Sequence, residues 1–143
     1  MLRNIGAILA GLVAWVVIAT VLDRGIRLCW PEYDAAVPSI VFTLPMMFAR
    51  LGEGAITTVA GGIINRLIAR GSLWPAAVQG VVILLLFLPT HYKLWHNFPV
   101  WYHLTFLVSL VPLAYVGGSS RPTRRRTAAS PPPAIRAGVH TPR

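Results

Sequence analysis

Residues 5–22 read IGAILAGLVAWVVIATVL, and none of these side chains is ionisable. An apolar run of this length matches the ~30 Å hydrocarbon core of a bilayer, because an α-helix rises ~1.5 Å per residue. The run is longer than the ~7–15 apolar residues of a typical signal peptide, and no small-x-small cleavage motif ends it. We therefore expect an uncleaved transmembrane helix here.

The composition of the whole chain is also that of a membrane protein. Hydrophobic residues make up 55% and charged residues only 12% of its 143 residues, whereas a soluble domain of this size needs a charged surface. Two further runs, 72–90 and 105–120, contain no Asp, Glu, Lys, Arg or His. Cys29 is the only cysteine, which excludes an intrachain disulfide and a cysteine metal cluster.

These runs predict an all-α domain over residues 1–118, a polytopic bundle of four transmembrane helices. The expected spans are about 5–22, 45–67, 74–89 and 99–116. The second span is the least regular, because Arg50 and Glu53 interrupt it, and we place its start at Pro45 so that it does not exceed the bilayer thickness. Between the first two spans, residues 23–44 mix charged and aromatic side chains, which favours an ordered loop or a short surface helix.

A predicted disordered tail follows at residues 119–143, rich in Pro, Ser, Thr, Ala and Arg. Much of the net charge of +9 lies there. Its arginines are Arg121, Arg124, Arg125, Arg126, Arg136 and Arg143. A basic segment beside a membrane helix more often contacts anionic lipid headgroups than nucleic acid. We expect the bilayer and its anionic headgroups as partners of the tail, and no nucleic acid.

The positions of Lys and Arg predict the orientation. With four spans, the N-terminus, the connection between the second and third spans and the tail share one side, which carries Arg3, Arg66, Arg70 and the tail arginines. The other side carries only Arg24, Arg27 and Lys93. The positive-inside rule therefore predicts that both termini are cytoplasmic.

Arg50 and Glu53 are the first candidate functional residues. A charge at the bilayer centre costs at least ~2.5–3.5 kcal/mol, so both are expected to face the bundle interior. Their spacing puts them on one helix face. In a structural interpretation, Arg50 extends to the outer headgroups and Glu53 pairs with it, with Arg24 or with Arg27. In a functional interpretation, the pair belongs to a proton or solute pathway.

Small residues four apart predict close helix packing. On the first span these are Gly6, Ala10 and Ala14, with Ala7 and Gly11 as a second pair. On the second span they are Gly54, Thr58 and Gly62. Such faces favour a homo-oligomer or a membrane-protein partner.

His91, His96 and His103 form an alternative metal or haem site on the proposed outer side. Their spacings match no short helical metal motif, and polar residues of an interfacial aromatic belt explain them as well. We therefore predict no cofactor and keep the three histidines as an alternative.

The segments FTLPMMFARL (42–51) and LWHNFPVWYHLTF (94–106) resemble small four-helix inner-membrane proteins of bacteria that have no assigned activity. The resemblance covers residues 1–118 and implies a bacterial inner-membrane location but no substrate. Spacing suggests no nucleophile–base pair and no phosphate loop, so an enzyme is not expected. The sequence predicts a small accessory or oligomeric membrane component, with a small transporter or channel subunit as the alternative.

Overall fold

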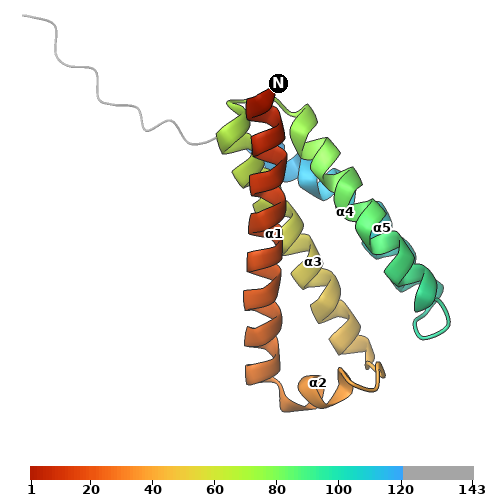
Figure 1. The fold of residues 1–143 in the computed structure, drawn as a ribbon. Coiled ribbons are helices and arrows are strands. Elements are labelled where there is room, and N and C mark those ends of the chain that lie inside the picture. The colour runs from red at the N-terminus through yellow and green to blue at the C-terminus, as the bar shows by residue number, and fades with distance from the viewer. Residues whose placement is uncertain (121–143) are drawn as a thin grey trace, which may run out of the picture.

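The helices of this protein form a bundle whose long members pass back and forth and whose shortest member lies at one end (Figure 1). The computed structural model describes residues 1–120, and this part of the chain contains no β-strand. Its helices are α1 (Leu2–Cys29), α2 (Pro31–Ala36), α3 (Leu44–Ala69), α4 (Trp74–Lys93) and α5 (Val100–Ser119). The prediction of an all-α fold is confirmed for these residues. The tail that the sequence predicts to be disordered lies, from residue 121 on, outside the described residues.

Three of these helices, α1, α4 and α5, are long and apolar enough to cross a membrane. The prediction of a membrane protein rests on them. α3 has 26 residues, which is sufficient length, but it also carries Arg50, Glu53, Asn65 and Arg66. It is therefore not apolar enough to count as a membrane span on composition alone.

The first helix is longer than its apolar run. α1 continues past residue 22 to Cys29 and stops at Trp30, whose φ of −138° and ψ of 84° are not helical. The ring of Pro31 disfavours the helical conformation of the residue before it, and proline itself is well suited to the first turn of α2. α2 lies within residues 23–44, for which the sequence favoured an ordered loop or a short surface helix, and the structure has the helix. The extension of α1 adds Asp23 to the bundle.

α4, which corresponds to the third predicted span, also runs further than expected. We predicted its end at Pro89, but α4 contains that proline and continues to Lys93. A proline removes one backbone hydrogen bond, yet in an apolar surrounding a helix still satisfies more backbone groups than an irregular chain does. As a consequence, His91 lies on α4 and faces the bundle.

The helices approach most closely at the end that holds the N-terminus (Figure 1). A Cβ atom added to Gly11 of α1 lies 3.0 Å from the carbonyl oxygen of Gly61 of α3, and the reverse distance is also 3.0 Å. A Cβ on Gly62 meets the carbonyl oxygen of Ala114 of α5 at even closer range. Glycine is required here because only a missing side chain lets these backbones touch.

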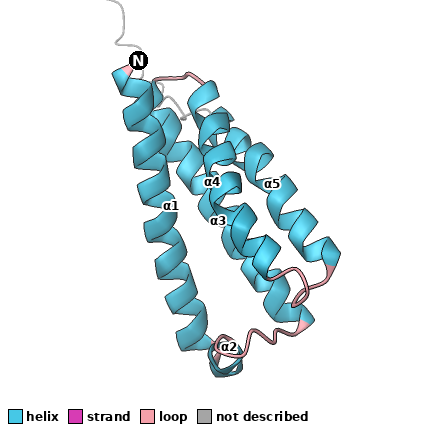
Figure 2. Cartoon of the chain, turned by 45° about the vertical axis from the view of Figure 1, so that its right-hand side comes forward, coloured by secondary structure: helices cyan, strands magenta, loops and turns pink. Residues whose placement is uncertain are grey.

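Towards α2 the helices diverge (Figures 1 and 2). Aromatic side chains replace glycine in this half: the ring centroids of Trp15 and Phe87 lie 5.3 Å apart, and those of Phe87 and Phe106 lie 5.4 Å apart. These large rings keep α1 apart from α4 and α5. Small residues thus let the helices close at one end of the bundle, and large residues keep them apart at the other.

Candidate functional site

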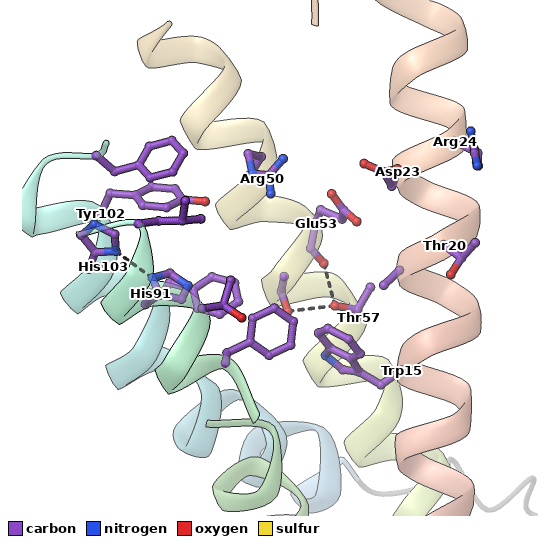
Figure 3. A pocket seen from close by; sticks show the side chains of 17 residues that line it. Trp15, Thr20, Asp23, Arg24, Arg50, Glu53, Thr57, His91, Tyr102 and His103 are labelled. Atoms are coloured by element: carbon purple, nitrogen blue, oxygen red, sulfur yellow. Dashed lines mark hydrogen bonds between the residues drawn. The ribbon is translucent and has the colours of Figure 1, made fainter. Parts of the chain in front are cut away.

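A partly open cavity of about 400 Å³ lies in the divergent half, between α1, α3, α4 and α5 (Figure 3). This volume is within the ~300–1,000 Å³ range of small-molecule pockets. Its polar lining consists of Thr20, Asp23, Arg24, Arg50, Glu53, Thr57, Thr90, His91, Tyr102 and His103. The cavity reaches from Trp15, in the middle of the apolar run of α1, to the charged residues just beyond the end of that run.

Trp15 forms the inner end of the cavity. Its indole nitrogen donates a hydrogen bond to Oγ1 of Thr58 at 3.1 Å, and that hydroxyl donates in turn to the carbonyl oxygen of Gly54 at 2.6 Å. The edge-to-face contact between Trp15 and Phe87 joins α1 to α4 at the same level. The indole therefore has both its polar and its apolar parts satisfied, and it closes the cavity against the glycine-rich half.

Arg50 is held by residues that precede α3. Its Nη1 donates to the hydroxyl of Tyr33 at 3.2 Å, and its guanidinium carbon lies 4.8 Å from the centre of the Phe42 ring. Tyr33 is fully buried, and this burial raises the pKa of its phenol, so the hydroxyl stays neutral and accepts from the arginine. Arg50 thus extends towards the α2 end, as the tilt of helical side chains predicts. Its partners there are protein groups, whereas the structural interpretation of the sequence expected lipid headgroups.

Glu53 has no ionic partner among residues 1–120, so the prediction that it pairs with Arg50, Arg24 or Arg27 is wrong. The ion pairs found there join Arg27 to Asp23 at 2.7 Å and to Asp34 at 3.6 Å. Arg27 lies one turn from Asp23 on the same helix, which makes that pair local, while Tyr33 holds Arg50. In Figure 3, Glu53 and Asp23 point toward one another across the cavity, and Arg24 points away from it.

The structure brings together two of the three candidate histidines. The Nδ1 atoms of His91 on α4 and His103 on α5 lie 2.8 Å apart beside the cavity. His96 lies in the connection between these helices, is exposed and does not line the cavity. Within the described range, no group of three His, Cys, Asp or Glu residues is arranged to hold a metal ion.

The predicted packing residues of the second span lie at helix contacts. Gly54, Thr58 and Gly62 are all buried, and a Cβ on Gly54 would come within 2.8 Å of Phe106. On α1, Gly6 is exposed and faces open space, while Ala10 and Ala14 are half-buried, so whether this stripe packs against another chain stays a prediction. The second pair on that helix, Ala7 and Gly11, is buried against the other helices of the chain.

Sequence reasoning missed Asp23 as a cavity residue, because it assigned this aspartate to a surface loop. A usable signal was present: an acidic residue directly after an apolar run faces the same side as residues one turn earlier if the helix continues. It also missed the contact between Tyr33 and Arg50, which depends on the path of the chain through α2 and cannot be inferred from spacing.

No protein-family model matches this chain, and no curated protein or solved structure matches it. What the cavity binds therefore has to follow from its own shape and chemistry.

Proposed function

We propose that the chain is an integral membrane protein in which α3 is a fourth span, packed on one side against the three apolar helices. The support is the way α3 divides its faces. Its polar and small residues, such as Thr57, Thr58 and Asn65, are buried. Its outward residues Ile56 and Leu67 are 59% and 61% exposed and apolar. A helix that is polar towards its neighbours and apolar on its free face suits a bilayer.

Four spans put the ends of the chain on one side. Arg3, Arg66 and Arg70 lie at the closed end of the bundle, as does the start of the arginine-rich tail, so the positive-inside rule assigns this end to the cytoplasm. The cavity then opens towards the outer face of a bacterial inner membrane. Anionic headgroups of the cytoplasmic leaflet are the expected partners of the tail.

Single cysteines test this topology on a Cys29→Ser background. Ser39 lies in the connection before α3 and Ser72 in the connection after it. A membrane-impermeant maleimide added to intact cells should label Ser39→Cys directly and Ser72→Cys only after the membrane is permeabilised. Labelling of both cysteines from the same side would mean that α3 does not cross.

The function that the geometry supports best is binding of a small solute from the outer face, as a small transporter or a ligand-binding subunit. The observation that carries it is the cavity, in which charged groups from α1 and α3 and a histidine pair from α4 and α5 converge over aromatic walls. Few polar groups converging on an apolar pocket are typical of ligand sites. A helix that served packing alone would not need Glu53 at this depth, because an intramembrane carboxylate is costly. No reaction is proposed.

The proposal is tested by measuring whether a water-soluble reagent reaches the cavity from the outside. Ala19→Cys lines the cavity, whereas Ala10→Cys is a matched control: also half-buried on α1, but in the closed half. A small, charged methanethiosulfonate reagent applied from the outside should modify Ala19→Cys and leave Ala10→Cys unmodified, because the thiol reacts as a thiolate in water. An unreactive Ala19→Cys would contradict a solvent-accessible binding site.

An accessory or oligomeric role is the second candidate, and one observation favours it. Gly6 leaves open space on the outward face of α1 beside the half-buried Ala10, so another helix has room to approach. Crosslinking through Gly6→Cys in native membranes should then give a dimer or an adduct with another membrane protein. Monomer alone would remove this candidate and leave ligand binding untouched.

A further inference from the structure

The two carboxylates of the cavity come from different helices and face one another. Asp23 belongs to α1 and Glu53 to α3, and Figure 3 shows their carboxylates directed into the space between these helices. Like charges repel more strongly in a site partly shielded from water, because the effective dielectric constant is low. A group placed between them is therefore favoured if it is positive.

Arg24 and Arg50 also line the cavity, but neither forms an ion pair with Asp23 or Glu53 within residues 1–120. Arg27 bonds Asp23 but also reaches Asp34 on the α2 side, and it does not line the cavity. Arg50 is held by the hydroxyl of Tyr33 and the ring of Phe42. No arginine of the described chain forms an ion pair with Glu53, so a ligand cation competes with no existing partner for this carboxylate.

The histidine pair adds a hydrogen-bond donor. His103 is fully buried, and its Nε2 has no hydrogen-bond partner among the described residues. An unpaired buried N–H is rarer than an unpaired acceptor, so the hydrogen of His103 belongs on Nδ1, where it is donated to Nδ1 of His91. His91 must then carry its own hydrogen on Nε2.

His91 presents that hydrogen to the cavity. Its side chain is only 8% exposed, it lines the cavity, and Figure 3 shows its ring turned into it. No residue within 1–120 accepts a hydrogen bond from Nε2 of His91. Nε2 of His91 is not among the buried atoms without a partner, so it is accessible from the cavity, where an acceptor atom of a ligand can receive its hydrogen.

Three aromatic rings also line the cavity. They are those of Trp15, Phe87 and Phe106. Aromatic faces attract cations and also shield alkyl groups from water, which makes them the usual surroundings of alkylammonium ligands.

We propose that the cavity binds a small organic ammonium ion that also carries a hydrogen-bond acceptor. The ammonium lies between Asp23 and Glu53 against the aromatic walls, and the acceptor oxygen receives the hydrogen of His91. This rests on the proposed function of the cavity as a binding site. The chemistry is shared by free amino alcohols and betaines and by the headgroup of an ethanolamine phospholipid.

Calorimetric titration of the purified full-length protein in detergent tests the ligand class. The probes are choline, ethanolamine and glycine betaine, and the neutral control is 3,3-dimethyl-1-butanol, which has the shape of choline without its charge. At least one ammonium probe should bind about tenfold more tightly than the neutral alcohol, the size of a desolvated cation–π and ionic contact. Equal or weaker binding of all three ammonium probes would overturn the proposal.

Variants locate the site. Glu53→Gln and Asp23→Asn should each remove most of the preference for the charged probe, while Glu32→Gln, an exposed carboxylate on α2, should leave it unchanged. His91→Phe should remove the preference for choline over tetramethylammonium, which has no acceptor. Preferences that persist in all three cavity variants would overturn the assignment.

Two outcomes separate this inference from the proposed function. If Ala19→Cys is accessible but propionate or the neutral alcohol binds best, the cavity is a binding site for another class of ligand. If Ala19→Cys is not accessible, the binding function itself fails. If an ammonium probe binds, nanodiscs distinguish the source of the natural ligand. Weaker binding of the probe in nanodiscs that contain phosphatidylethanolamine than in nanodiscs of phosphatidylglycerol alone identifies a lipid headgroup. Equal binding of the probe in both identifies a free solute.

Discussion

The Nδ1 atoms of His91 and His103 lie 2.8 Å apart and join α4 to α5 beside the cavity. Aromatic rings hold both imidazoles: Phe106 stacks on His91 at 4.7 Å between ring centroids, and Trp95 stacks on His103 at 4.9 Å. Because rotation of either ring would break a stacking contact, the pair keeps its orientation. The orientation of the His91 ring beside the cavity is therefore set before a ligand arrives.

Removal of one histidine of this pair should destabilise the protein. His103→Phe keeps the aromatic contacts but leaves Nδ1 of His91 buried without a partner, which costs about 1–3 kcal/mol. His96→Phe is the matched control, because His96 is exposed and lies in the connection next to the pair. Thermal unfolding in detergent should show a lower midpoint for His103→Phe alone. Equal midpoints would mean that the hydrogen bond contributes nothing.

The closed end of the bundle depends on glycine. In Gly62→Ala the new methyl group would overlap the backbone of Ala114 in α5, and a backbone cannot turn aside as a side chain does. We expect destabilisation of about 1–3 kcal/mol from this overpacking. Gly52→Ala on the same helix is the control: nothing lies within 4 Å of its Cβ, so it should stabilise the helix by about 0.5–1 kcal/mol. Similar effects of both substitutions would contradict the close contact of α3 and α5.

A buried amide pair joins α3 to α4. Nδ2 of Asn65 donates to Oε1 of Gln79 and to the carbonyl oxygen of Pro75, each at 3.0 Å, and both amide side chains are fully buried. Asn65→Leu should cost about 1–3 kcal/mol, since it leaves Gln79 unpaired, whereas the double change with Gln79→Leu should recover much of that loss. A double-mutant cycle of unfolding free energies checks this. Strictly additive losses would show that the two amides do not interact.

Arg50 donates to the hydroxyl of Tyr33 and forms no ion pair with Glu53 within the described residues. Tyr33→Phe removes the acceptor at 3.2 Å, so the guanidinium is released to turn towards the carboxylate one turn along α3. An ion pair of ~1 kcal/mol formed in this way would weaken binding of an ammonium probe by about fivefold. Tyr92→Phe, at a tyrosine that is 81% exposed, should bind like the unmodified protein. Unchanged affinity in Tyr33→Phe would show that Arg50 does not compete for Glu53.

Hydropathy alone was sufficient for much of the fold. The all-α class and the apolar runs of α1, α4 and α5 follow from the sequence, because each residue that faces lipid must be apolar and each backbone group must be bonded within its helix. The polar stripe of α3 also followed, since Arg50 and Glu53 stand out in an apolar segment. These are properties of single residues and of their spacing along one helix.

Only the tertiary structure decided which of these features meet. Two stripes of small residues lie on α1, and a rotation of one residue decides that Gly11 packs while Gly6 faces outward. Competition between partners decides that Arg50 binds Tyr33 and that Glu53 is left to face Asp23. Helix rotation and partner choice depend on all neighbours at once, so spacing along the chain could identify Arg50 and Glu53 as candidates but not the cavity they line.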